Sequence, residues 1–144
     1  MIGVLGLEDG TRLEGMGFGA PGIVSGELVF TTIMSGYEEA LTDPSYNGQL
    51  LMFTYPLIGN YGVSGDHFQS DHMRTTALVC REIWNRPAHH RSSRTLSQFL
   101  EDEGRPGICS LDTRMLTIKI RNEGSMRAAL AVGEDADVVE LARV

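Results

Sequence analysis

The stretch Met34-Ser-Gly-Tyr-Glu-Glu-Ala-Leu-Thr-Asp-Pro-Ser-Tyr46 lies between two apolar, β-branched runs, Glu27–Ile33 and Gln49–Tyr55. Both runs predict strands, and the connection is too long for a hairpin turn of about two to five residues. Ser35 can cap one short helical turn, which Asp43-Pro44 then ends because the residue before proline avoids the α region. A loop held between buried strands can present side chains to a ligand, although the spacing also fits a surface crossover without chemistry.

Composition indicates an ordinary globular domain. The chain has 144 residues, 42% of them apolar and 22% charged, and we expect one domain over residues 1–144. The net charge is -7, from 12 basic and 19 acidic residues. This charge argues against nucleic acid or an anionic membrane as the main partner, because both attract positive surfaces. One basic stretch, around Arg86, Arg91 and Arg94, fits a solvated loop or a protein contact.

Neither a membrane segment nor a secretory signal is expected. No apolar run approaches the roughly 20 residues of a spanning helix. The first residues lack the basic region that opens a signal peptide, and they include Glu8 and Asp9. Cys80 and Cys109 each lie in an apolar run, so we interpret them as reduced, buried thiols of a cytoplasmic protein.

Turn and capping signals divide the chain into strands followed by alternating strands and helices. Strands are expected over Ile2–Leu7, Arg12–Gly19, Ile23–Ile33, Gln49–Tyr55, Thr75–Glu82, Gly107–Leu111 and Met126–Val132. Helices are expected from a Thr95–Gln98 capping box to Gly104, from an Asp112 cap to Gly124, and over Asp135–Arg143. The first three strands should form an antiparallel unit. The whole order indicates a mixed sheet system with helices on one side.

Two short motifs indicate neither a dinucleotide-binding site nor an acid–base pair. Gly17-Phe-Gly-Ala-Pro-Gly22 satisfies the dinucleotide-binding pattern in letters, but that site requires a helix after the glycines. Here proline and a strand follow, so a turn is predicted. Glu38 and Glu39 are adjacent, and neighbours in a helix do not face each other, so we interpret them as a solvated helical turn.

The candidates for metal binding and nucleophilic catalysis are weak. Asp66, His67, Asp71 and His72 have suitable side chains, but their spacing matches no zinc pattern and favours a polar loop. A reactive cysteine needs an exposed, electropositive position, which the surroundings of Cys80 and Cys109 do not offer. We therefore expect no self-sufficient catalytic site and no metal site.

Arg114 is the least explained charged residue. Asp112 is accounted for as a helix N-cap, but a cation in the first helical turn opposes the helix dipole. We expect Arg114 either to pair with a carboxylate or to reach a partner surface.

Three long motifs resemble one known family. Ser35–Tyr46, Thr54-Tyr-Pro-Leu-Ile-Gly-Asn-Tyr-Gly62 and Ser110-Leu-Asp-Thr-Arg114 are similar, in the same order and at similar spacing, to carbamoyl-phosphate synthase. The resemblance is to the amino-terminal domain of its small, glutamine-hydrolysing subunit. It covers essentially the whole chain. It implies a three-layer β/β/α domain of the swivelling type.

The resemblance also implies that the chain is one part of a larger enzyme. The family makes carbamoyl phosphate from glutamine, bicarbonate and ATP, for arginine and pyrimidine biosynthesis. A class I glutaminase domain follows in the family and hydrolyses glutamine with a cysteine nucleophile, while ATP and Mg are used in the large subunit. None of those catalytic residues has a counterpart here. The implied role is to dock the large subunit and complete one wall of the glutamine pocket, without activity of its own.

Ser45 is the site residue that the resemblance implies. In the family, the serine of the Asp-Pro-Ser-Tyr segment reaches the neighbouring glutaminase domain and contacts the substrate glutamine, and Asp43–Tyr46 keeps that segment intact. A serine fixed after a proline can orient an amide or carboxylate, which makes it a positioning residue and not a nucleophile. The residues alone do not favour Ser45 over Thr42.

Two other functions stay open from the sequence. One is a non-catalytic binding module of another assembly, and the other is a small stand-alone hydrolase built from distant residues. Contacts with other domains or subunits are expected at the central loop and at Pro56–Gly65, where Leu57, Ile58 and Tyr61 are apolar.

Overall fold

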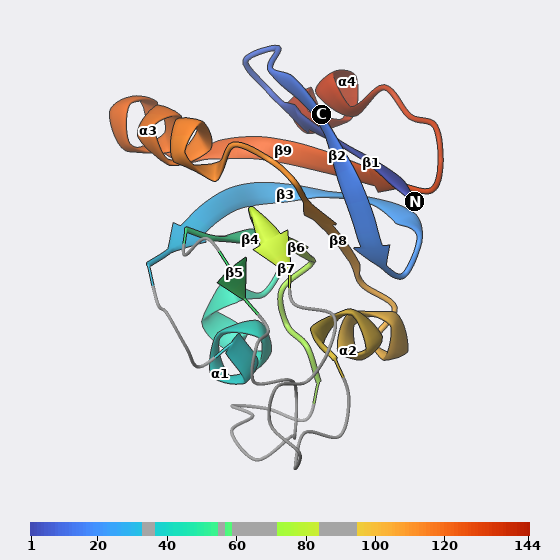
Figure 1. Ribbon diagram of the computed structural model, residues 1–144. Helices are drawn as coiled ribbons and strands as arrows, with labels where there is room; N and C mark the ends of the chain where they lie inside the picture. The colour runs from blue at the N-terminus through green and yellow to red at the C-terminus, as the bar shows by residue number, and fades with distance from the viewer. Residues whose placement is uncertain (33–36, 55–56, 59–71, 84–94) are drawn as a thin grey trace.

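The structure is a computed structural model that describes residues 1–32, 37–54, 57–58, 72–83 and 95–144 (Figure 1). Several expectations fall outside these ranges and stay predictions. They concern the cap at Ser35, the segment 59–65, the residues Asp66, His67 and Asp71, and the basic stretch within 84–94.

Seven strands close into one barrel in the described part of the chain. In barrel order they are β1 (Ile2–Leu7), β2 (Arg12–Gly19), β8 (Pro106–Cys109), β6 (Ala77–Val79), β4 (Gln49–Phe53), β3 (Gly22–Thr31) and β9 (Met126–Val132). A separate parallel pair joins β5 (Leu57–Ile58) to β7 (Glu82–Ile83). The helices are α1 (Tyr37–Thr42), the 3-10 turn η1 (Pro44–Tyr46), α2 (Leu96–Asp102), α3 (Thr113–Glu123) and α4 (Val138–Arg143).

The barrel combines two kinds of pairing. Strands β3, β4, β6 and β8 pair parallel with one another, whereas β9, β1 and β2 pair antiparallel with each other and with β3 and β8. The mixed α/β class is therefore confirmed. The finer expectation of three layers is not established, because all seven strands are hydrogen-bonded into a single barrel and do not form two separate sheets.

The expected antiparallel unit of the first three strands is only half right. β1 and β2 pair as predicted, but β3 pairs with β9 and β4 and not with β2. The backbone N–H of Ala20 donates to the Arg105 carbonyl oxygen at 3.0 Å. The chain therefore leaves β2 along the start of β8 and crosses to the far side of the barrel before β3 begins.

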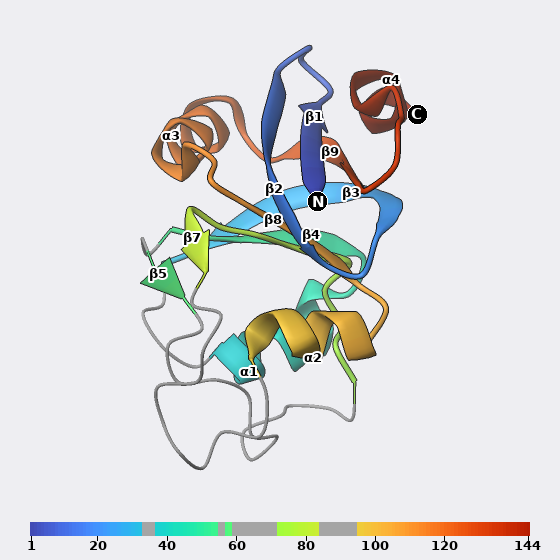
Figure 2. The same cartoon turned by 45° about the vertical axis from the view of Figure 1, so that its right-hand side comes forward.

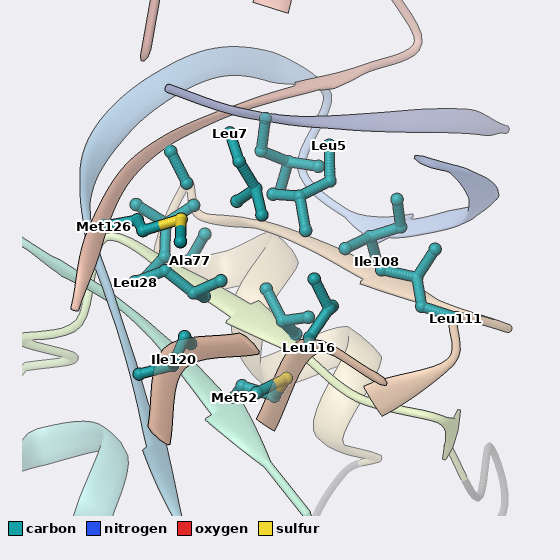
Figure 3. Close-up of a cluster of buried hydrophobic side chains, with 14 of the residues drawn as sticks. Leu5, Leu7, Leu28, Met52, Ala77, Ile108, Leu111, Leu116, Ile120 and Met126 are labelled. Carbon is teal, nitrogen blue, oxygen red and sulfur yellow. The ribbon is translucent and has the colours of Figure 1, made fainter. Parts of the chain in front are cut away.

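Alternation along the strands separates two apolar regions. Leu50 and Met52 of β4 point into the barrel, where Figure 3 shows Met52 beside Leu116 of α3. Leu51 and Phe53 point outward, toward α1 and α2. The barrel core also contains Leu5, Leu7, Leu28, Ala77, Val79, Ile108, Leu111, Ile120, Met126, Ala128, Leu130 and Val132.

The expectation that all helices lie on one side is wrong. α1 and α2 cover the outer face of β4 and β6, and α4 lies on the opposite side of the barrel (Figures 1 and 2). There Val138 packs on the small side chains of Ala129 and Ala131. A Cβ at Gly6 would come within 2.6 Å of the Val138 backbone, so glycine is what allows this helix to approach.

Local capping signals predicted the ends of α2 and α3 well, whereas the helix expected from Asp135 begins at Val138, after an Asp137 cap. Thr95 and Gln98 form the expected capping box at α2, with hydrogen bonds of 2.9 and 3.1 Å. Asp112 accepts from the Met115 N–H at 3.0 Å and begins α3, and Gly124 ends that helix. The expected strand over Thr75–Glu82 is instead broken into β6 and β7.

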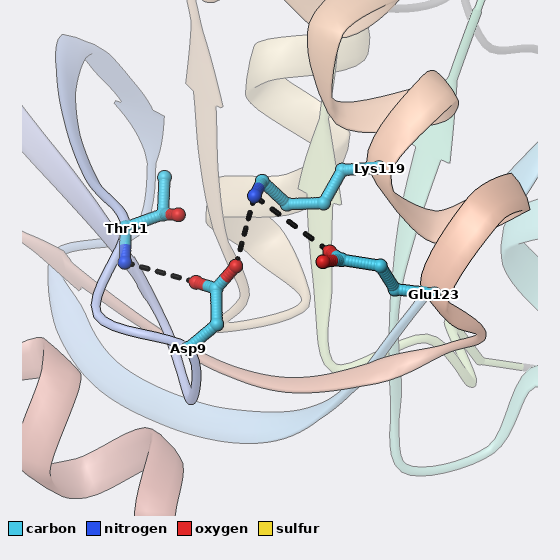
Figure 4. Close-up of polar contacts among 4 residues, drawn as sticks. All are labelled: Asp9, Thr11, Lys119 and Glu123. Atoms are coloured by element: carbon cyan, nitrogen blue, oxygen red, sulfur yellow. Dashed lines mark hydrogen bonds and ion pairs between the residues drawn. The ribbon is translucent and has the colours of Figure 1, made fainter.

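Asp9 joins the first hairpin to α3 (Figure 4). Its carboxylate accepts from Lys119 Nζ and from the Thr11 N–H, both at 2.9 Å, and Glu123 lies 3.7 Å from the same ammonium group. Partial burial alone raises the pKa of Asp9, but the hydrogen bonds from Lys119 and Thr11 outweigh it and hold that pKa at about 2. The charged form of Asp9 is thus favoured by folding.

Asp9→Asn should therefore make stability less dependent on pH. A carboxyl group whose pKa is lower in the folded than in the unfolded state stabilises the folded protein at pH values above the unfolded-state pKa. This contribution disappears as the pH falls from about 4 to about 2. We expect the variant to melt below the wild type at pH 7, and the two melting temperatures to converge toward pH 2. A constant difference across thermal melts in this range would contradict the assignment.

Candidate functional site

Ser45 lies in a short turn that hydrogen bonds from its neighbours hold together. The Asp43 carboxylate accepts from the Ser45 N–H at 2.9 Å, and the Asn47 N–H donates to the Pro44 carbonyl oxygen at 3.1 Å. Asp43 is extended, with φ -73° and ψ 120°, as expected before a proline. The backbone N–H of Ser45 is therefore occupied, whereas its side chain is exposed.

Ser45 and Thr42, between which the sequence did not decide, differ in burial. Thr42 is fully buried at the end of α1, whereas Ser45 is exposed three residues later. Of these two hydroxyl side chains, Ser45 is the one that can meet a ligand from another domain.

Packing on both sides fixes this loop. On one side, Tyr37 of α1 stacks edge to face on Phe53 of β4, with ring centroids 5.7 Å apart and planes at 83°. On the other side, a Cβ at Gly26 of β3 would clash with the carbonyl oxygen of Gly48. Gly48 itself has φ 78°, a conformation that favours glycine. The turn thus lies between α1 on one side and the close contact of Gly26 with Gly48 on the other.

Both cysteines are buried and unpaired, as predicted. Burial raises the pKa of Cys80 well above its ordinary value, with a further contribution from Cys109. Burial also raises the pKa of Cys109, although the Ser110 hydroxyl partly opposes this. Neither thiol has the exposure or the lowered pKa of a nucleophile.

The metal-type cluster is represented by one described residue. His72 is exposed, and its Nδ1 lies 3.5 Å from Glu103 Oε1. Across the described ranges, no three His, Cys, Asp or Glu side chains gather as metal ligands. The same residues hold no helix long and apolar enough to cross a membrane. The glycine motif at Gly17–Gly22 lies in a strand and the following turn, as predicted.

Arg114 lies away from Ser45 and beside two arginines that sequence reasoning missed. It is exposed in the first turn of α3 and lines a surface hollow with Arg81 and Arg121. Ser45 precedes the amino end of β4, whereas Thr54, which lines the same hollow, follows its carboxyl end. No local signal joins Arg81 to Arg114, because they are brought together by the pairing of β6 with β8 and by the hydrogen bond from the Ser110 N–H to the Arg81 carbonyl oxygen.

Comparisons with known proteins give one consistent family. Residues 5–130 match the family described as carbamoyl-phosphate synthase small chain, CPSase domain. The carbamoyl phosphate synthase small chain of Methanosarcina acetivorans is 63% identical over 145 residues, which are 99% of this chain and 39% of that protein. The small chain of Archaeoglobus fulgidus is 52% identical over 143 residues, 99% of this chain and 40% of that protein.

The similarity extends to bacteria but only to part of each relative. The small chain of Bacillus cereus is 51% identical over 132 residues, 92% of this chain and 36% of that protein. This chain thus spans about 39% of the length of the curated relatives. Among solved structures, an aminopeptidase from Aneurinibacillus sp. strain AM-1 matches 90% of this chain and 30% of that protein, with a TM-score of 0.50 and 16% identity. That likeness concerns the fold alone.

Proposed function

Because the chain belongs to the carbamoyl-phosphate synthase small-chain family, we propose that it works as the amino-terminal domain of the small subunit. In this role it docks the large synthetase subunit and completes one wall of the glutamine pocket. The observation that supports the second part is the exposed Ser45, held in a fixed turn while Thr42 is buried.

The complete enzyme would make carbamoyl phosphate from glutamine, bicarbonate and ATP, for arginine and pyrimidine biosynthesis in the cytoplasm. Glutamine hydrolysis would belong to a glutaminase domain, and ATP and Mg to the large subunit. The two buried thiols support this division, because the described residues contribute no nucleophilic cysteine. This chain would help to position the substrate, because its Ser45 hydroxyl would orient glutamine for chemistry performed in the glutaminase domain.

We also infer that the barrel is a flattened version of the three-layer swivelling fold. The antiparallel strands β9, β1 and β2 would form one layer and the parallel strands β3, β4, β6 and β8 the second. α1 and α2 would form the third layer, since they cover the outer face of the parallel strands.

Ser45→Ala in a complete small chain tests the role in the glutamine pocket. Losing one hydrogen bond to a charged substrate group costs about 1.5–3 kcal/mol, so we expect the KM for glutamine to rise by roughly ten- to a hundredfold. A positioning residue should leave kcat much less affected, because the nucleophile and base are untouched. Ammonia release at varied glutamine concentrations gives both constants.

Ser25→Ala is the matched control, because Ser25 is exposed on β3 and the change is the same. Its KM for glutamine should equal that of the wild type. Equal kinetics for Ser45→Ala and wild type would remove Ser45 from the glutamine pocket.

The rival hydrolase and binding-module functions are not favoured by the comparisons, which name small chains of one enzyme. Incubating the purified 144-residue chain with glutamine separates the hydrolase from our proposal. We expect no ammonia release, and a rate above a heat-denatured control would contradict the positioning role.

A further inference from the structure

A cationic hollow lies where three neighbouring parallel strands end. Thr54 follows β4, Arg81 follows Cys80 after β6, and Ser110 follows β8. Thr54 and Arg81 line a hollow of about 420 Å³, and Arg81 and Ser110 line an adjoining one of about 580 Å³. In open α/β sheets and in parallel β/α barrels, ligands bind beyond the carboxyl ends of the strands. The hollow lies at the corresponding ends of the parallel strands of this mixed barrel.

Positive charge is concentrated in the smaller hollow. Arg81, Arg114 and Arg121 line it from two separate parts of the chain, and no carboxylate is among its described lining residues. Within the described ranges, none of these three guanidinium groups forms an ion pair or a side-chain hydrogen bond. Lys119, which lies on α3 with Arg114 and Arg121, is instead paired with Asp9 and Glu123.

Two carboxylates border the larger hollow. Glu82 and Asp112 line it together with Arg81 and Arg114. The Asp112 carboxylate already accepts a hydrogen bond from the Met115 N–H as the cap of α3. All three arginines are exposed, and a bound anion would supply the counter-charge that the described lining residues of the smaller hollow do not.

We propose that the smaller hollow binds a small anionic ligand with at least two negative charges, a phosphate ester or a polycarboxylate. Guanidinium groups bind both kinds of anion through paired N–H donors. The volume lies within the roughly 300–1,000 Å³ of small-molecule sites. Ile118 is 47% exposed at the rim and offers an apolar contact to the rest of the ligand. This site is separate from Ser45 and does not depend on the role proposed for the domain.

Titration calorimetry of the 144-residue chain with inorganic phosphate and with citrate tests the proposal. Sodium chloride keeps the ionic strength constant, because charge interactions at an exposed site are screened by salt. We expect saturable binding of at least one anion, and the stronger of the two identifies a phosphoryl or a carboxylate ligand. Arg114→Gln and Arg121→Gln should each weaken binding by about tenfold or more.

Arg105→Gln is the matched control, because it removes the same charge at the amino end of β8, opposite the hollow. Its affinity should equal that of the wild type. Thermal melts without ligand verify that each variant is folded, and Arg114→Lys, which keeps the charge but loses the paired donors, should also bind more weakly. Absence of saturable binding to the wild type, or equal affinities for wild type and both glutamine variants, would overturn the proposal.

Discussion

Replacing Phe53 by alanine should lower the free energy of unfolding by about 3–5 kcal/mol. Phe53 ends β4 and is completely buried, with its ring against Tyr37 of α1. The substitution removes the transfer free energy of the side chain and leaves a cavity that the strand and helix cannot fill. It also removes the aromatic pair, which contributes about 0.5–1.5 kcal/mol beyond burial. This is the largest stability effect that we expect from a single side chain near the site.

Phe53→Leu gives the matched comparison, since it keeps most of the apolar volume and loses the ring contact. Denaturant unfolding should rank the proteins wild type, leucine variant and alanine variant in decreasing stability. A loss below about 1 kcal/mol for Phe53→Ala would mean that α1 does not pack on β4 as described. Because α1 leads directly into Asp43–Tyr46, the same variant should disturb the position of Ser45.

Gly26→Ala should have the second-largest effect on the free energy of unfolding, because Gly26 contacts Gly48 on the other side of the Ser45 turn. A Cβ at Gly26 would clash with the Gly48 carbonyl oxygen and would lie 3.2 Å from Leu50 Cδ1. Backbone atoms cannot rotate away, so the start of β4 must separate from β3, where Glu27 pairs with Gln49. Overpacking of this kind costs about 1–3 kcal/mol.

The consequence for function distinguishes Gly26→Ala from a general loss of stability. In a complete small chain, we expect the KM for glutamine to rise as it does in Ser45→Ala, at temperatures where the variant is still folded. Ser25→Ala, one residue away on the exposed face of β3, should change neither stability nor KM. A destabilised Gly26→Ala with the wild-type KM would show that the Gly26–Gly48 contact does not position Ser45.

Features that depend on a few adjacent residues could be predicted from the sequence. The Thr95–Gln98 box, the Asp112 cap and the Gly124 stop are satisfied by hydrogen bonds within one or two turns. β1, β2 and β9 end where predicted, because glycine or charged turn residues flank the apolar runs of β1 and β9 and the glycine-rich β2. These signals require no knowledge of which strands become neighbours.

Features that depend on distant pairing could not be predicted in the same way. The barrel order places β3 between β4 and β9, and the position of α4 depends on Gly6 meeting Val138. The gathering of Arg81 with Arg114 follows from the β6–β8 pairing, which joins residues about thirty positions apart. The choice of Ser45 over Thr42 rested on resemblance in the sequence and gains support from burial in the structure.

Calorimetric titration of this chain into the purified cognate large subunit tests the docking role most directly. We predict saturable binding, since the family match covers residues 5–130 and relatives that match 99% of the chain are small chains of this enzyme. The complete small chain, titrated in parallel, shows that the large subunit is competent to bind. No saturable binding by the folded 144-residue chain, beside clear binding by the complete small chain, would contradict the claim that this domain docks the large subunit.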